Sequence, residues 1–122
     1  MQDHVEYHDV AHQGEVRMEA VEAIPDDCVP ATVERDGQGR WIVSHSERGH
    51  HHVLPADCEV VERTERGARV LYALVKEPGR ALIQDASGES HKPVPMRPRQ
   101  AYRLSVGQEL DPWSGQARTI AD

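Results

Sequence analysis

Alternating apolar and polar residues are the clearest pattern along this chain of 122 residues. In residues 15–20, Val16, Met18 and Ala20 alternate with charged side chains, and residues 102–106 show the same period of two. Such a period is typical of strands with one buried face. We expect strands at both places, although the glutamate and alanine content of the first would also suit a helix.

Turn signals divide the remaining sequence into further short strands. Asp-Gly, Arg-Gly and Pro-Gly pairs separate the expected strands, which are residues 31–35, 41–45, 50–54, 58–65, 68–76, 80–85 and 116–121. The run ARVLYALVK at 68–76 predicts a central strand buried on both faces. Pro93, Pro95 and Pro98 cannot donate to an interior ladder, so they indicate an edge or crossing segment.

The recurrence of turns about every ten residues predicts an all-β fold, either an antiparallel β-barrel or a β-sandwich. The length allows one domain, which we expect to span residues 14–122. Residues 1–13 are polar and are expected to form an N-terminal arm. His4, His8 and His12 would share one face of a helix there and could chelate a metal, but so short a terminal segment is more often mobile.

Composition narrows the classes of partner. The chain has 14 basic and 21 acidic residues and a net charge of −7, which opposes binding to nucleic acid or to anionic membranes. No apolar run approaches the ~20 residues that span a bilayer, and no segment resembles a signal peptide. The two cysteines, Cys28 and Cys58, form no C-x-x-C pair and are expected to be small, partly buried side chains. We expect a cytoplasmic protein.

Clustered histidines are the strongest chemical signal. The segment HSERGHHHVL at 45–54 contains four of the eight histidines. If this segment is a hairpin with a four-residue loop, His45 pairs with His50 and Val43 pairs with His52. The pairing depends on the register, because a slip of one residue would separate these side chains.

In this register the imidazoles of His45, His50 and His52 share one face of the hairpin, and His51 points to the other face. Neutral imidazoles are common ligands of zinc, nickel and iron. Three of them on a rigid hairpin, with His91 as a candidate fourth ligand, predict a divalent metal site with an open position. Three carboxylates are candidates for a further ligand or for orienting the imidazoles, namely Glu47, Asp57 and Glu59.

Other interpretations of the hairpin stay open. If only Trp41 and Leu54 faced the core, the histidines would be ordinary surface groups. Alternatively, the histidines would form a contact that responds to pH, because imidazoles change charge near physiological pH. The chain contains no G-x-S-x-G elbow, no H-E-x-x-H pair and no P-loop, so no reaction is indicated and the enzyme question is left open.

Three segments resemble a family of small bacterial proteins carried by mobile elements such as integron gene cassettes. They are QGEVRMEAVEAIP at 13–25, SHSERGHHHVL at 44–54 and HKPVPMRPRQAYRL at 91–104. The resemblance implies an accessory role and carries no activity with it.

A second resemblance is to cupins, the β-barrels that hold a metal with an H-x-H pair, an acidic residue and a later histidine. His50, His52 and Asp57 are similar to the first part of that motif, but Asp57 stands in place of the usual glutamate and His91 precedes the proline-rich segment. We therefore predict a non-catalytic module with a histidine-lined pocket for a metal or small ligand. The alternatives are a cupin-like metal-dependent enzyme and a homo-oligomeric protein-interaction module without metal.

Overall fold

The computed structural model describes residues 5–45, 50–84, 92–110 and 117–119. Its strands are β1 (Val10–Gln13), β2 (Val16–Val21), β3 (Val29–Pro30), β4 (Trp41–Ser44), β5 (His52–Leu54), β6 (Glu59–Glu65), β7 (Ala68–Leu74), β8 (Arg80–Gln84), β9 (Val94–Met96), β10 (Ala101–Val106), β11 (Gln108–Leu110) and β12 (Ala117–Thr119). All strand pairs are antiparallel, and no helix occurs in these ranges. The predicted all-β class is confirmed.

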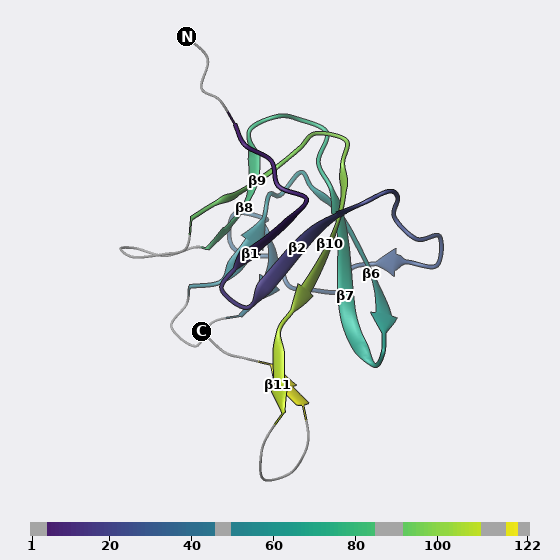
Figure 1. The fold of residues 1–122 in the computed structure, drawn as a ribbon. Helices are drawn as coiled ribbons and strands as arrows, with labels where there is room; N and C mark the ends of the chain where they lie inside the picture. Colours follow the sequence, from purple (N-terminus) through teal and green to yellow (C-terminus); the bar gives the residue numbers. More distant parts are fainter. Residues whose placement is uncertain (1–4, 46–49, 85–91, 111–116, 120–122) are drawn as a thin grey trace.

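Two sheets make up the body of the molecule (Figure 1). The larger has six strands in the order β1-β2-β10-β7-β6-β3, and the smaller has four in the order β4-β5-β8-β9. The sheets do not close into a barrel. Of the two predicted architectures, the structure therefore has the β-sandwich. The β11–β12 hairpin continues from the end of β10 and projects away from the body (Figure 1).

The core fills the space between the two sheets. Val16 and Met18 of β2 and Leu104 of β10 contribute from the larger sheet, and Leu54 and Leu82 contribute from the smaller one. All five side chains are at most 1% exposed. Because the chain contains no phenylalanine, aliphatic side chains provide most of this burial, at about 25 cal/mol per Å² of apolar surface.

The strand predicted to be buried on both faces is β7. Leu71 and Ala73 face the core, while Val70 and Tyr72 are only 3% and 4% exposed on the opposite face. The β6–β7 hairpin closes with a two-residue turn in which Arg66 and Gly67 have φ of 52° and 81°. Two left-handed residues suit the right-handed twist of the flanking strands, which explains the Arg-Gly signal in the sequence.

Two local predictions differ from the structure, and a third is confirmed. Val10–Gln13, the last four residues of the expected N-terminal arm of residues 1–13, form the paired strand β1 at the end of the larger sheet. Residues 31–35 form no strand, only an isolated bridge from Arg35 to Trp41, because the chain pairs earlier at Val29–Pro30. The edge prediction for the prolines is confirmed, since Pro95 lies in β9 at the edge of the smaller sheet.

Candidate functional site

The histidine hairpin does not have the predicted register. Trp41 pairs with Leu54 as expected, but a bulge between Ile42 and Ser44 makes Ser44, and not Val43, the partner of His52. A bulge places an extra residue in one strand and turns the following side chains to the other face. The predicted alignment of His45, His50 and His52 is therefore wrong.

The histidines separate into two environments. The rings of His45 and His51 meet edge to face, with centroids 4.9 Å apart and an interplanar angle of 74°. His45 is exposed, and His50, which is half-buried, accepts a hydrogen bond on its carbonyl from Gln84 at 3.2 Å. His52 is fully buried at 0% exposure.

Among the described residues, no three His, Cys, Asp or Glu side chains lie close enough together to hold a metal ion. Asp57 and Glu59 lie elsewhere, since Asp57 pairs with Arg80 at 2.7 Å and Glu59 pairs with Lys76 at 3.3 Å. Glu47 and His91 lie outside the described residues, so the predicted metal site stays a prediction.

A buried polar cluster lies where the hairpin meets the larger sheet, and it consists of Gln13, Glu15, Ser44 and His52. Gln13 Oε1 lies 2.9 Å from His52 Nδ1, and Glu15 Oε2 lies 3.4 Å from His52 Nε2. The Ser44 hydroxyl donates to Glu15 Oε1 at 2.7 Å. The Glu15 side chain is only 2% exposed, so its carboxylate is shielded from water. The cluster joins the two sheets.

A tight turn brings Glu15 into this cluster. Gln13 pairs with Val16, so the β1–β2 hairpin has a two-residue loop that begins at Gly14 with φ 57°. Glycine adopts this left-handed conformation without steric cost. The Glu15 carbonyl accepts a hydrogen bond from the Gly107 amide at 2.7 Å, which ties the turn to the end of β10.

The tautomer of His52 follows from its neighbours. Gln13 Nε2 donates to the carbonyls of Leu82 and Lys92, each at 3.0 Å, so Gln13 Oε1 is the atom that faces the ring. An oxygen accepts only, and His52 Nδ1 must therefore carry a proton. The Nε2 atom then faces a carboxylate oxygen, and the contact is favourable only if Nε2 or Glu15 Oε2 carries another proton.

The order of groups in the cluster does not match a serine nucleophile. In that chemistry the histidine takes the proton of the serine and the carboxylate orients the histidine. Here the carboxylate of Glu15 stands between Ser44 and His52, and the serine proton is directed to Glu15. The geometry therefore serves structure and binding better than acyl transfer.

A cavity of about 670 Å³ lies next to Ser44, at the end of the sandwich. Its described walls come from the end of β4, from the β6–β7 hairpin and from the second half of β10, with the residues Val43–His45, Glu65, Gly67–Leu71 and Arg103–Val106. This volume is in the range that small-molecule sites occupy.

The cavity arises because the larger sheet splits. Pairing between β7 and β10 ends at Leu71 and Leu104. Beyond that point β7 continues toward Ala68 paired only with β6, and β10 continues to Val106 paired only with β2. The facing edges of the two strands thus have no partner strand among the described residues. We call this space the split-sheet cavity.

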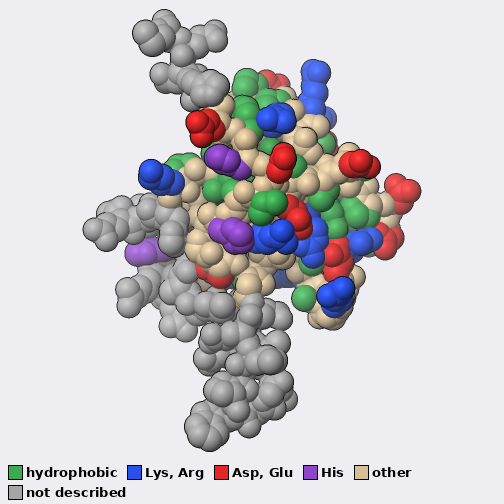
Figure 2. Space-filling model, in the orientation of Figure 1, with side chains coloured by type: hydrophobic (Ala, Val, Ile, Leu, Met, Phe, Trp, Pro, Cys, Tyr) green, Lys and Arg blue, Asp and Glu red, His purple; other side chains and the backbone are tan. Residues whose placement is uncertain are grey.

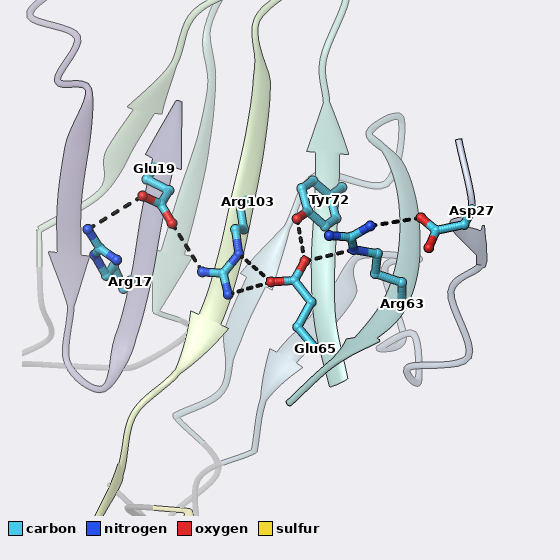
Figure 3. Close-up of polar contacts among 7 residues, drawn as sticks. All are labelled: Arg17, Glu19, Asp27, Arg63, Glu65, Tyr72 and Arg103. Atoms are coloured by element: carbon cyan, nitrogen blue, oxygen red, sulfur yellow. Dashed lines mark hydrogen bonds and ion pairs between the residues drawn. The ribbon is translucent and has the colours of Figure 1, made fainter. Parts of the chain in front are cut away.

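The outer rim of the cavity belongs to a row of charges across the larger sheet (Figure 3). The row runs from Arg17 and Glu19 on β2 through Arg103 on β10 to Glu65, Arg63 and Asp27. Acidic and basic side chains are accordingly mixed on this face (Figure 2). The Tyr72 hydroxyl, together with Arg63 and Arg103, lowers the pKa of Glu65 to about 2.

Sequence reasoning missed the members of this site other than the histidines. Glu15 was expected on the polar side of a strand, and Ser44 carried no signal. The Gln-Gly-Glu sequence at 13–15 is the one available hint, because glycine between two polar residues marks a turn.

Searches against protein-family models, curated proteins and solved structures find no match for this chain. In the part of the chain that the structure describes, no helix is long and apolar enough to cross a membrane. The fold and the site define a two-sheet antiparallel β-sandwich with a split-sheet cavity above a buried polar cluster.

Proposed function

We propose that the protein is a non-catalytic accessory module that binds a small polar molecule in the split-sheet cavity. The observation that carries the proposal is the position of Ser44. This residue lines the cavity, and its hydroxyl donates a hydrogen bond to Glu15 Oε1 at 2.7 Å. Behind Ser44, Glu15 Oε2 is buried without a hydrogen-bond partner among the described residues, and such costly groups are more expected at a binding site than in a purely structural core.

Preformed walls also support binding. The cavity is bounded by three elements that the core holds in place, and its exposed strand edges offer main-chain donors and acceptors. Because these walls are already ordered, binding of a ligand would cost little free energy for ordering the protein.

A fragment screen tests the proposal directly. Isotope-labelled protein is mixed with neutral and charged fragments, and amide shifts are followed by two-dimensional NMR. We expect saturable shifts confined to residues 43–45, 67–71 and 103–106. Hits that map only to other surfaces would overturn the proposal.

Binding of a metal ion by the hairpin histidines is tested by a separate experiment. Elemental analysis of untagged protein, with the double variant His50→Ala and His52→Ala, measures bound zinc, nickel or iron. If the wild type carries about one equivalent of metal and the double variant carries none while circular dichroism shows that its fold is retained, metal binding is supported. If the wild-type protein is metal-free and still binds fragments, only the small-ligand proposal stands.

A further inference from the structure

The charges in the wall of the split-sheet cavity indicate which ligand it takes, if the proposed binding function holds. The described wall contains two arginines and one glutamate, Arg69, Arg103 and Glu65, together with His45. The whole chain has a net charge of −7, so a wall with more positive than negative groups departs from the rest of the molecule.

Arg103 and Glu65 already satisfy one another and their neighbours (Figure 3). Arg103 donates to Glu65 Oε1 through Nε at 3.1 Å and Nη2 at 2.8 Å, and to Glu19 through Nη1 at 3.0 Å. Glu65 Oε2 accepts from Tyr72 at 2.5 Å and from Arg63 at 2.8 Å. Neither group needs a ligand.

Arg69 differs from Arg103 in this respect. Its one hydrogen bond in the described structure is a long contact of 3.5 Å to Thr32 Oγ1, and it forms no ion pair with a described carboxylate. Arg69 precedes Leu71 by two residues on β7, so both side chains lie on the inner face of the sheet. His45 lies on the opposite wall and is exposed, and its Nε2 atom is 3.8 Å from Glu34 Oε2.

We propose that the split-sheet cavity binds a small oxyanion, with the Arg69 guanidinium as its main anchor. The planar guanidinium matches the two oxygens of a carboxylate or phosphate, and such charge-assisted hydrogen bonds are stronger than neutral ones. Main-chain N–H groups on the unpaired edges of β7 and β10 supply further donors to the anion.

The test compares anions with a neutral isostere. Full-length labelled protein is titrated at constant ionic strength with sodium acetate, sodium phosphate and acetamide, and the amides of the cavity wall are followed by NMR. Acetate or phosphate is expected to give saturable shifts at residues 69–71 and 103–106, and acetamide is expected to bind at least about tenfold more weakly. Whichever anion binds more tightly identifies the oxyanion class.

Variants at two positions of the same hairpin separate a specific site from a general charge effect. Arg69→Gln should weaken anion binding about tenfold, and Arg69→Lys should weaken it less because the charge remains. Arg66→Gln removes the same charge from the adjacent turn, at a residue that does not line the cavity, and should change affinity by less than about twofold. Spectra of each variant outside the hairpin should overlay those of the wild type.

Equal weakening by the Arg69→Gln and Arg66→Gln variants would overturn the oxyanion assignment. Binding of acetamide as tightly as acetate would also overturn it while the proposed binding function stood. Absence of wall shifts with every fragment and anion would overturn both.

Discussion

Gln13 fixes the chemistry of His52 at the scale of single residues. Its amide nitrogen donates hydrogen bonds to two carbonyls. The side-chain oxygen, which can only accept, therefore faces the buried imidazole. The other ring nitrogen, Nε2, lies 3.4 Å from Glu15 Oε2, and a proton on either of these two atoms makes the contact favourable. Buried pairs of this kind commonly add little net stability, because removing both partners from water is costly.

The substitution Glu15→Gln tests this account. The new amide would accept from Ser44 through its oxygen and donate to Nε2 of a neutral His52, so the contacts of residue 15 with both side chains are kept without a buried charge. We expect the free energy of unfolding to stay within about 1 kcal/mol of the wild type or to rise. Urea denaturation at pH 7 measures it.

The substitution His52→Ala should behave differently. It leaves Gln13 Oε1 without its donor and creates a void at a fully buried position, so we expect a loss of about 2–4 kcal/mol in the free energy of unfolding. The control is His12→Ala on exposed β1, with a change below about 0.5 kcal/mol. A loss after Glu15→Gln as large as after His52→Ala would contradict the proton arrangement.

The two free cysteines should react at different rates. Burial raises the pKa of the Cys58 thiol to about 12, and Cys58 is 4% exposed. Burial, with the nearby Asp27, also raises the pKa of Cys28, but Cys28 is only half-buried. Since the thiolate is the reactive form, a disulfide reagent at pH 8 should modify Cys28 in the native protein and Cys58 only after unfolding. Equal rates, or an unchanged fast phase in Cys28→Ser, would contradict this.

At the scale of elements, cross-strand ion pairs hold the outer face of the larger sheet. The row in Figure 3 links β2, β10, β7 and β6, and Glu65 receives donors from three of its neighbours. The Arg63 guanidinium lies over the Tyr72 ring, 5.8 Å from its centroid, and Arg103 is the cross-strand neighbour of Tyr72. These long side chains cover the outer face of β7 without a second layer.

Acid should weaken this row through Glu65. The folded pKa of about 2 lies below the ordinary 4.5, so the contribution of Glu65 is present above pH 4.5 and is lost as pH falls toward 2. At pH 7, Glu65→Gln should lower the free energy of unfolding by about 1–2 kcal/mol. The difference from the wild type should shrink between pH 4.5 and 2.

Urea denaturation at pH 7, 4 and 3 measures this difference. The matched control is Glu59→Gln on the same strand, where the exposed carboxylate pairs with Lys76 at 3.3 Å and should contribute less than about 0.5 kcal/mol. A difference between Glu65→Gln and the wild type that stays constant with pH would contradict the role of Glu65.

At the scale of the whole molecule, the sheet edges oppose assembly through strand pairing. The larger sheet ends at the short strands β1 and β3, and β3 contains Pro30. The smaller sheet ends at β4, which has a bulge, and at β9, which contains Pro95. Short, bulged and proline-containing edges are the usual protection against edge-to-edge pairing.

Replacing Pro95 with valine should weaken that protection. Valine restores a main-chain N–H at the edge of β9 and favours strand structure, so association is expected to rise with protein concentration. Light scattering across about a hundredfold concentration range measures the mass, with wild type expected to stay at the monomer mass. Concentration-dependent mass in the wild type would contradict the role assigned to the edges.

The sequence alone determined the class of fold. The period of two in residues 15–20 and 102–106, the two-residue turn at Arg66-Gly67 and the apolar run 68–76 each predicted a strand or turn that the structure contains. These features are local, because side-chain alternation and turn conformation depend on neighbours in the chain.

Tertiary structure decided the site. The bulge before Ser44 places that serine, and not Val43, opposite His52, and it has no marker in the residue pattern. Glu15 and Arg69 become site residues only because the Gly14 turn meets His52 and because β7 separates from β10 beyond Leu71. Both events depend on contacts between segments distant in sequence, and such contacts are set by packing of the two sheets rather than by local periodicity.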